Sequence, residues 1–232
     1  MIDFLNIKSI ITPKGEIVSI SKGNEVLWEK QTLPYKTELK YIESTGTQWI
    51  DVGVNKIMTR KEDKISVGFE PRNVSNSAYL FGVMTGSRGG AIRTRSATWI
   101  QASIWQGGGP AAANVDTIYK KFDIEISTTE GFILDGVFQV AAGTGSMSIY
   151  GVDYFPLCIG AHVTASGQAA TTYQVTPTKG RYYYLKVEQE GVLIRDMIPV
   201  LDWNDVPCMY DHLSGELFYN NGTGDFLYAN KT

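Results

Sequence analysis

Short runs with strand character, separated by turn-forming residues, recur along most of this 232-residue chain. Apolar and polar residues alternate at 64–70 and at 121–127, as they do in strands that bury one face. Residues 132–137 carry Asp135-Gly136, a dipeptide typical of hairpin turns. No segment has a convincing helical period. We therefore predict an all-β chain, built as a two-layer antiparallel sandwich.

The residue types agree with this pattern. The chain has 24 glycines, which supply the positive φ angles of tight turns, and 13 tyrosines, 9 phenylalanines and 5 tryptophans, which suit half-buried pleated surfaces. Hydrophobic residues make up 43% of the chain, an ordinary share for a protein with a sizeable core. We expect Leu134 and Ile159 to lie inside that core.

The charge balance excludes one class of partner. The net charge is -3 and the isoelectric point is near 5.5. Binding to phosphate backbones needs a basic surface, so no nucleic-acid partner is expected. The first residues lack the basic start and apolar run of a secretory signal, and no apolar run is long enough for a membrane helix. We expect a protein made in a cytoplasm, with no membrane partner.

Residues 1–30 are predicted to form a small separate β unit. Two short alternating runs, 17–20 and 25–28, flank a turn that contains Gly23. A hairpin this short buries too little surface to be stable alone. We therefore expect the unit to anchor the chain to a partner or to further copies of itself, through Ile20, Val26 and Trp28.

The remaining chain is predicted to be a linker followed by one large domain. Residues 31–38, with Pro34, are the expected linker, and residues 39–232 the expected sandwich. Cys158 and Cys208 are the only cysteines. We favour two free core thiols over a disulfide, although spacing alone does not decide whether they pair.

Segments at both ends of the large domain resemble one family. Residues 39–53 (LKYIESTGTQWIDVG) are similar to the opening of concanavalin-A-like or laminin-G-like lectin-fold domains in phage and prophage virion structural proteins of gut bacteria. Residues 195–200 and 209–226 resemble the ending of the same domains. Residues 132–137 and 157–161 look like the family's hairpin and its Ile-Gly-Ala strand. The resemblance implies a jelly-roll sandwich, located in a virion and made in the cytoplasm of a bacterial host.

The closing segment also has a direct physical interpretation. Asp211, followed by Ser214-Gly215, suggests an Asx-type turn in which the carboxylate accepts backbone N–H groups. Gly222-Thr223-Gly224 predicts a second tight turn. We therefore expect the segment to close the sandwich and not to bind a ligand.

The resemblance implies a function, with two alternatives. It favours a virion structural protein displayed on the particle for adhesion to host or surface glycans, with other virion proteins and further copies as partners. The first alternative is a purely architectural capsid decoration, head fibre or tail component. A distant alternative is a glycan-cleaving enzyme. The position in the virion, the glycan and the oligomeric state stay open.

Two tryptophans suggest where a glycan would bind. Trp99 and Trp105 lie six residues apart on one predicted strand, so both side chains should project to the same face. Core packing is favoured for Trp99. Trp105 precedes a glycine-rich loop, and for this residue core packing and an exposed platform both stay open. An indole offers a flat face for a sugar ring, and amide and guanidinium groups can bind its hydroxyls. The predicted carbohydrate site comprises Trp105, Gln101, Gln106, Arg93 and Arg95.

The acidic residues do not form a recognisable hydrolase pattern. Glycoside hydrolases hold two carboxylates across one sugar bond. The nearest patterns are Asp123-Ile124-Glu125 and Glu188-Gln189-Glu190, and we expect both on solvated strand faces. His162 and His212 have neither a strained serine elbow nor the spacing of a zinc site around them. We predict no catalytic residue and no enzyme activity.

Calcium is the one metal left open. Many laminin-G-like domains hold calcium between loops, and Asp202, Asn204 and Asp205 are oxygen donors of the kind it accepts. Trp203 and Pro207 favour an ordinary loop at this position. We therefore predict no cofactor and assign no metal ligand.

Overall fold

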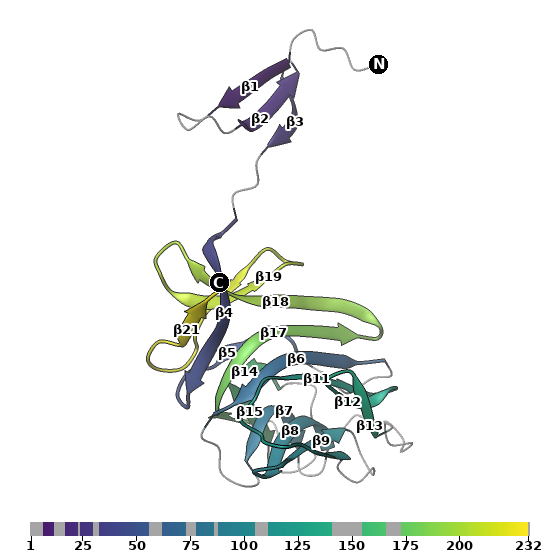
Figure 1. The fold of residues 1–232 in the computed structure, drawn as a ribbon. Helices are drawn as coiled ribbons and strands as arrows, with labels where there is room; N and C mark the ends of the chain where they lie inside the picture. The colour runs from purple at the N-terminus through teal and green to yellow at the C-terminus, as the bar shows by residue number, and fades with distance from the viewer. Residues whose placement is uncertain are drawn as a thin grey trace. The chain divides into compact units, whose positions relative to one another are not determined.

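The computed structural model describes residues 7–11, 17–22, 24–29, 33–55, 62–72, 78–85, 88–104, 111–140, 155–165 and 173–231. The chain divides into two compact units, Met1–Pro34 and Tyr35–Thr232. Every regular element in the described ranges is a strand, and none is a helix (Figure 1). The prediction of an all-β chain is confirmed.

The first unit is a three-stranded antiparallel sheet. It contains β1 (Ile7–Ile11), β2 (Ile17–Lys22) and β3 (Glu25–Glu29), in that order. The expected hairpin is formed by β2 and β3, and β1 adds a strand that the sequence pattern did not indicate. The expected linker ends earlier than residue 38, because Tyr35 already begins the first strand of the second unit.

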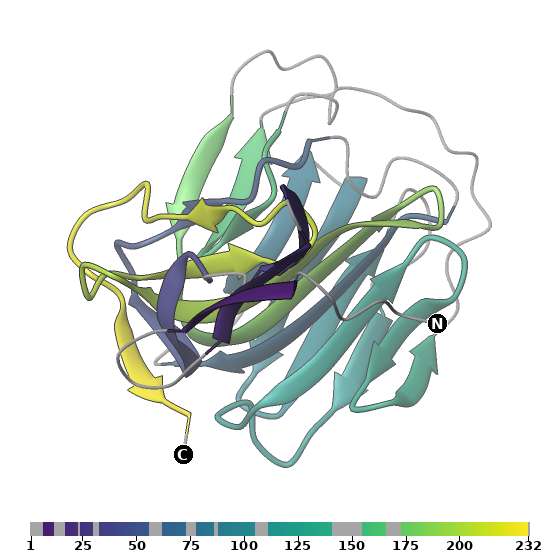
Figure 2. The same ribbon diagram turned by 90° about the horizontal axis from the view of Figure 1, so that it is seen from above.

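The larger sheet of the second unit has ten strands. Its spatial order is β13-β12-β11-β6-β17-β4-β18-β19-β20, with β21 paired to β4. Their bounds are β4 (Tyr35–Thr45), β6 (Lys64–Pro71), β11 (Phe122–Ser127), β12 (Gly131–Leu134), β13 (Val137–Val140), β17 (Lys179–Gln189), β18 (Val192–Asp202), β19 (Pro207–Asp211), β20 (Leu217–Phe218) and β21 (Leu227–Asn230). The last strand of the chain therefore lies beside the first strand of its unit (Figure 2).

The smaller sheet has six strands in the order β10-β9-β8-β7-β15-β16. Their bounds are β7 (Tyr79–Thr85), β8 (Arg88–Ser96), β9 (Trp99–Ile104), β10 (Ala111–Asn114), β15 (Ala161–Ala165) and β16 (Gln174–Pro177). A short ladder also joins β5 (Ile50–Asp51) to β14 (Cys158–Ile159). Neighbours are antiparallel except β7 and β15, which run parallel. The predicted antiparallel arrangement therefore holds for every described pair of these sheets except this one.

One hydrophobic core joins the two large sheets. Val67 and Phe69 from the ten-stranded sheet belong to the same buried cluster as Phe81 and Ile100 from the six-stranded sheet. In Figure 1, β7, β8 and β9 form a layer beside β6, β11 and β17, so the unit is sandwich-like. The cluster also contains Leu134 and Ile159, as expected.

The two cysteines are separate, free and buried. Cys158 belongs to the main core, whereas Cys208 belongs to a smaller cluster with Tyr35, Val200 and Tyr210. Burial raises the pKa of the Cys158 thiol, and it raises that of Cys208 to about 12. Both residues therefore act as small hydrophobic side chains, as favoured from the sequence.

The opening and closing segments of the second unit bind each other in a terminal clasp, formed by residues 44–51 and 220–226. Asn220 Oδ1 accepts the N–H of Trp49 at 3.0 Å, and Asn221 Oδ1 accepts the N–H of Asp51 at 2.9 Å. A Cβ atom on Gly222 would lie 2.0 Å from the Thr47 carbonyl oxygen, so only glycine fits there. The motifs at the two ends of the unit are thus parts of one structural closure.

The predicted Asx turn is present at Asp211. Its Oδ1 accepts the N–H of Leu213 at 3.3 Å and of Asp196 at 2.8 Å, and its Oδ2 accepts the Ser214 hydroxyl at 2.9 Å. The side chain is fully buried. This carboxylate is used to hold the β19–β20 loop, in agreement with a closing role.

Candidate functional site

Two of the five residues predicted to bind a carbohydrate meet on the six-stranded sheet. Arg93 on β8 and Gln101 on β9 are directly paired across the strands. Arg93 Nε donates to Gln101 Oε1 at 2.5 Å. Arg95 lies on the same strand as Arg93, but its side chain is outside the described residues, as are Trp105 and Gln106. The predicted site is therefore located only in part.

Trp99, at the start of β9, is exposed on the outward face of the six-stranded sheet. Ile100 and Ala102 on β9 point into the core. Because side chains alternate along a strand, Trp99 and Gln101 point to the opposite, outward face. Trp99 is 37% exposed, so our expectation that it packs in the core is wrong.

Tyr79 and His162 extend the same face. Tyr79 on β7 pairs with Arg93, whose guanidinium carbon lies 5.7 Å from the centre of the tyrosine ring. The His162 ring on β15 lies 5.2 Å from the Tyr79 ring. We call this outward surface of the six-stranded sheet the Trp99 surface; it consists of Tyr79, Arg93, Trp99, Gln101 and His162.

Two polar atoms of the Trp99 surface have no hydrogen-bond partner in the described structure. They are Gln101 Nε2 and His162 Nδ1, and both are buried. A buried polar group without a partner costs about 1–3 kcal/mol. Gln101 is only 1% exposed, so a ligand reaches its amide only if the groups that cover it move. Burial also lowers the pKa of His162, which favours the neutral imidazole. The accessible part of the surface is the partly exposed Trp99 ring together with the partly exposed side chains of Tyr79, Arg93 and His162.

Sequence reasoning missed Tyr79 and His162 for a physical reason. Tyr79 lies in a run that is otherwise apolar, and β15 reaches β7 only through a parallel pairing between distant segments. The outward position of Trp99 could have been predicted from the local sequence. Ile100 and Ala102 are the apolar positions of its strand, so alternation already placed Trp99 on the other face.

Three of the four acidic residues weighed as a catalytic pair, Asp123, Glu125 and Glu188, are engaged by cations or hydroxyls. Glu125 and Glu188 flank the same Lys64 amino group, at 3.2 and 3.9 Å. Asp123 accepts the Tyr184 hydroxyl at 3.1 Å. Glu190 has a positive φ of 51° in the β17–β18 turn. This arrangement is an ion-pair network on the outward face of the ten-stranded sheet.

The Asp202 loop uses its oxygens internally. Asp202 Oδ1 accepts the N–H groups of Asn204 and Val206, both at 2.8 Å, and Oδ2 accepts the Tyr219 hydroxyl at 3.1 Å. Asp205 pairs with Lys36 at 2.6 Å. Within the described ranges, no three His, Cys, Asp or Glu side chains gather as a metal site.

The predicted assembly residues lie on the first unit. Val26 on β3 is 61% exposed, and Ile20 on β2 is partly buried. Trp28 is on β3, but its side chain is outside the described residues.

No protein-family model, curated protein or solved structure matches this chain. The described part of the chain also contains no helix that is long and apolar enough to cross a membrane. Any functional statement therefore rests on the residues themselves.

Proposed function

We propose that the chain is a phage virion structural protein whose second unit is a concanavalin-A-like or laminin-G-like jelly-roll sandwich, displayed for adhesion to host or surface glycans. Two large sheets around one core support this fold. The terminal clasp supports it further, because the two segments that resemble such domains bind each other. A shared fold does not fix a ligand, so a binding function has to be supported by a particular surface of the domain.

The Trp99 surface is the feature that supports glycan binding. It places a partly exposed indole on the sheet face that also carries Tyr79 and Arg93, which are partly exposed. Sugar rings offer apolar C–H faces and polar hydroxyl edges, so they need both kinds of contact. The side chains lie on a rigid sheet, which reduces the entropy lost on binding.

The test compares two tryptophan variants of the full chain on a glycan array and on host cells. We expect Trp99→Ala to reduce binding by about tenfold or more, because the loss of a central aromatic contact commonly costs over 1 kcal/mol. The matched control is Trp203→Ala, which removes a 65% exposed indole in the β18–β19 turn.

The control should bind like the unchanged protein, and both variants should keep nearly the same melting temperature. If Trp99→Ala unfolds the protein, Trp99 is a packing residue. If both variants bind normally, the Trp99 surface does not bind the glycan.

The first unit favours the architectural alternative. It is a compact unit of its own, Met1–Pro34, with an exposed Val26. Units below about 40 residues bury too little surface to be stable without further support. Such a unit is stabilised when it packs on a partner. Deletion of residues 1–34 should leave the second unit folded but absent from particles. Normal incorporation of the truncated chain would contradict an anchoring role.

A further inference from the structure

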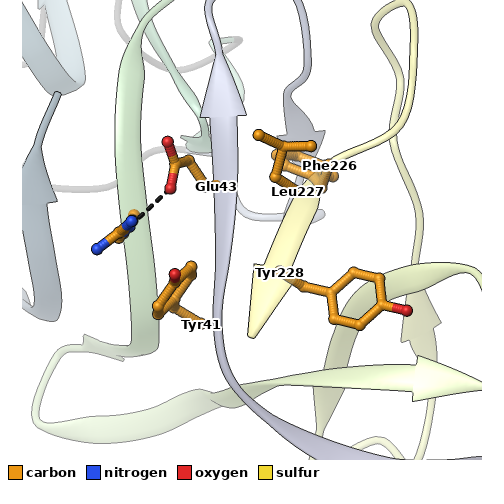
Figure 3. Close-up of a pocket in the computed structure, with 6 residues that line it drawn as sticks. Tyr41, Glu43, Phe226, Leu227 and Tyr228 are labelled. Atoms are coloured by element: carbon orange, nitrogen blue, oxygen red, sulfur yellow. Dashed lines mark hydrogen bonds and ion pairs between the residues drawn. The ribbon is translucent and has the colours of Figure 1, made fainter. Parts of the chain in front are cut away.

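A surface pocket of about 500 Å³ lies on the ten-stranded sheet, whereas the Trp99 surface lies on the six-stranded sheet (Figure 3). We call it the Tyr41 pocket; its lining residues are Tyr41, Glu43, Arg181, Phe226, Leu227 and Tyr228. Arg181 on β17 and Leu227 on β21 each pair directly with Glu43 on β4. These three side chains therefore form one row across three strands. Their neighbours Ile42 and Tyr182 are in the core, so the row points outward.

The polar side of the Tyr41 pocket is the ion pair between Arg181 and Glu43, and each residue has a further polar atom that can bind a ligand. Arg181 Nε donates to Glu43 Oε2 at 2.6 Å, and Arg181 Nη1 lies 3.5 Å from Glu70 Oε2. Glu43 Oε1 and Arg181 Nη2 have no hydrogen-bond partner in the described part of the chain. A strong acceptor and a strong donor thus lie side by side, and both remain available to a ligand.

The charges around the pocket are balanced. Glu43 pairs with Arg181, and the nearby Glu70 pairs with Arg72 at 3.2 Å. A charged ligand would therefore meet as much repulsion as attraction. A neutral ligand with hydroxyl groups meets no such penalty.

The apolar side comes from aromatic and aliphatic groups. The Arg181 guanidinium carbon lies 4.3 Å from the centre of the Tyr41 ring, which fixes both groups. Leu227 is 55% exposed, and Phe226 is buried beneath it. Figure 3 shows the Tyr228 ring directed away from Tyr41, so Leu227 and Tyr41 are the apolar groups nearest the ion pair.

We propose that the Tyr41 pocket is a second carbohydrate site, which binds one ring of a neutral sugar. Adjacent hydroxyls of a pyranose each donate and accept, so one can donate to Glu43 Oε1 while its neighbour accepts from Arg181 Nη2. The C–H face of the ring would pack on Leu227. The volume lies within the range of about 300–1,000 Å³ that is common for small-molecule sites.

The two sites would give one domain two opposite binding faces. The Trp99 surface and the Tyr41 pocket lie on the outward faces of two sheets that share one core. A single copy could then bridge two glycan chains, which a one-sided lectin domain cannot do. The inference extends the proposed adhesion function but uses none of its residues.

The test is an amide NMR titration of the full chain with glucose, galactose and N-acetylglucosamine as neutral probes. Glucuronate and glucosamine serve as the anionic and cationic counterparts. We expect at least one neutral sugar to shift the amides of Glu43 and Leu227, with a Kd of about 1 mM. Both charged sugars should bind more weakly.

Two variants make the test specific. Glu43→Gln keeps the shape but weakens the acceptor, so affinity should fall about tenfold. Leu227→Ala removes the apolar contact from an exposed position, and affinity should also fall. The matched control is Glu188→Gln, an outward glutamate of the same sheet that pairs with Lys64 outside the pocket; its affinity should be unchanged.

Several results would overturn the inference. They are the absence of pocket shifts with every neutral probe, tighter binding of glucuronate than of glucose, and equal affinities of Glu43→Gln and Glu188→Gln. Trp99→Ala separates this site from the first. Pocket shifts that persist in Trp99→Ala support the Tyr41 pocket whatever happens on the array. A sugar that shifts only the Trp99 surface refutes the pocket and leaves the proposed function standing.

Discussion

The Asn220 side chain makes three hydrogen bonds in the terminal clasp, one to the opening segment and two within its own turn, and alanine would remove all three. Its Oδ1 accepts the N–H groups of Trp49 and Gly222, at 3.0 and 2.8 Å, and its Nδ2 donates to the Gly224 carbonyl at 2.5 Å. Each such bond contributes about 0.5–1.5 kcal/mol, so three contribute about 1.5–4.5 kcal/mol. The site is partly exposed, and water would replace some of these bonds. We therefore expect Asn220→Ala to lower the free energy of unfolding by about 2 kcal/mol.

Urea and thermal unfolding of the full chain would measure this loss. For a unit of this size, about 2 kcal/mol corresponds to a fall in Tm of about 4–8 °C. The matched control is Asn230→Ala on β21, where the side chain is exposed, and its effect should stay within about 0.5 kcal/mol. Equal effects of the two substitutions, or a loss below about 0.5 kcal/mol for Asn220→Ala, would refute the argument that the clasp stabilises the unit.

Two further predictions concern ionisation. Burial opposes ionisation of Asp202, but hydrogen bonds from N–H groups of its own turn outweigh burial and lower the pKa of its carboxyl. The stability that Asp202 contributes is therefore present above its ordinary pKa and lost as the pH falls through the lowered value, so the stability difference from Asp202→Asn should shrink between about pH 5 and pH 2. Urea unfolding across this range tests it, with the exposed Glu216→Gln as a control; a constant difference would contradict the pKa direction. Cys158 and Cys208, whose thiols burial keeps protonated, should not react with Ellman's reagent at about pH 8 until the chain is unfolded. Release of one equivalent from the native protein would contradict their burial.

Local patterns predicted much of the strand content, because alternation and turn chemistry act over a few residues. The run at 64–70 is β6, and 122–127 is β11. Asp135-Gly136 forms the turn between β12 and β13, with positive φ at both residues. The Asp211 turn likewise has local bonds, from the Leu213 N–H and the Ser214 hydroxyl, although its carboxylate also accepts the N–H of Asp196 on β18. Each of these features is decided mainly within one short segment.

Long-range pairing could not be predicted in the same way. Residues 35–38 were expected in a linker, yet they pair with residues 200–202 of β18 and so begin β4. β4 also pairs with β17 and β21, and that is what creates the row of Arg181, Glu43 and Leu227. Nothing in the local pattern around Glu43 shows which strands will lie beside it. The Tyr41 pocket is a product of topology, so it could be found only in the folded chain.

Two weak sites on opposite faces would suit a protein that works in many copies. A shallow pocket with one ion pair and one exposed leucine offers few contacts, so its affinity for a single sugar ring should be low. Linked sites gain about 10²–10⁴ in avidity without any new contact, provided that the copies are held together. The first unit is a separate small sheet with an exposed valine, and it offers a means of holding them. Under this proposal the second unit binds the glycans, and the first unit holds several copies of the chain together so that their weak contacts act at once.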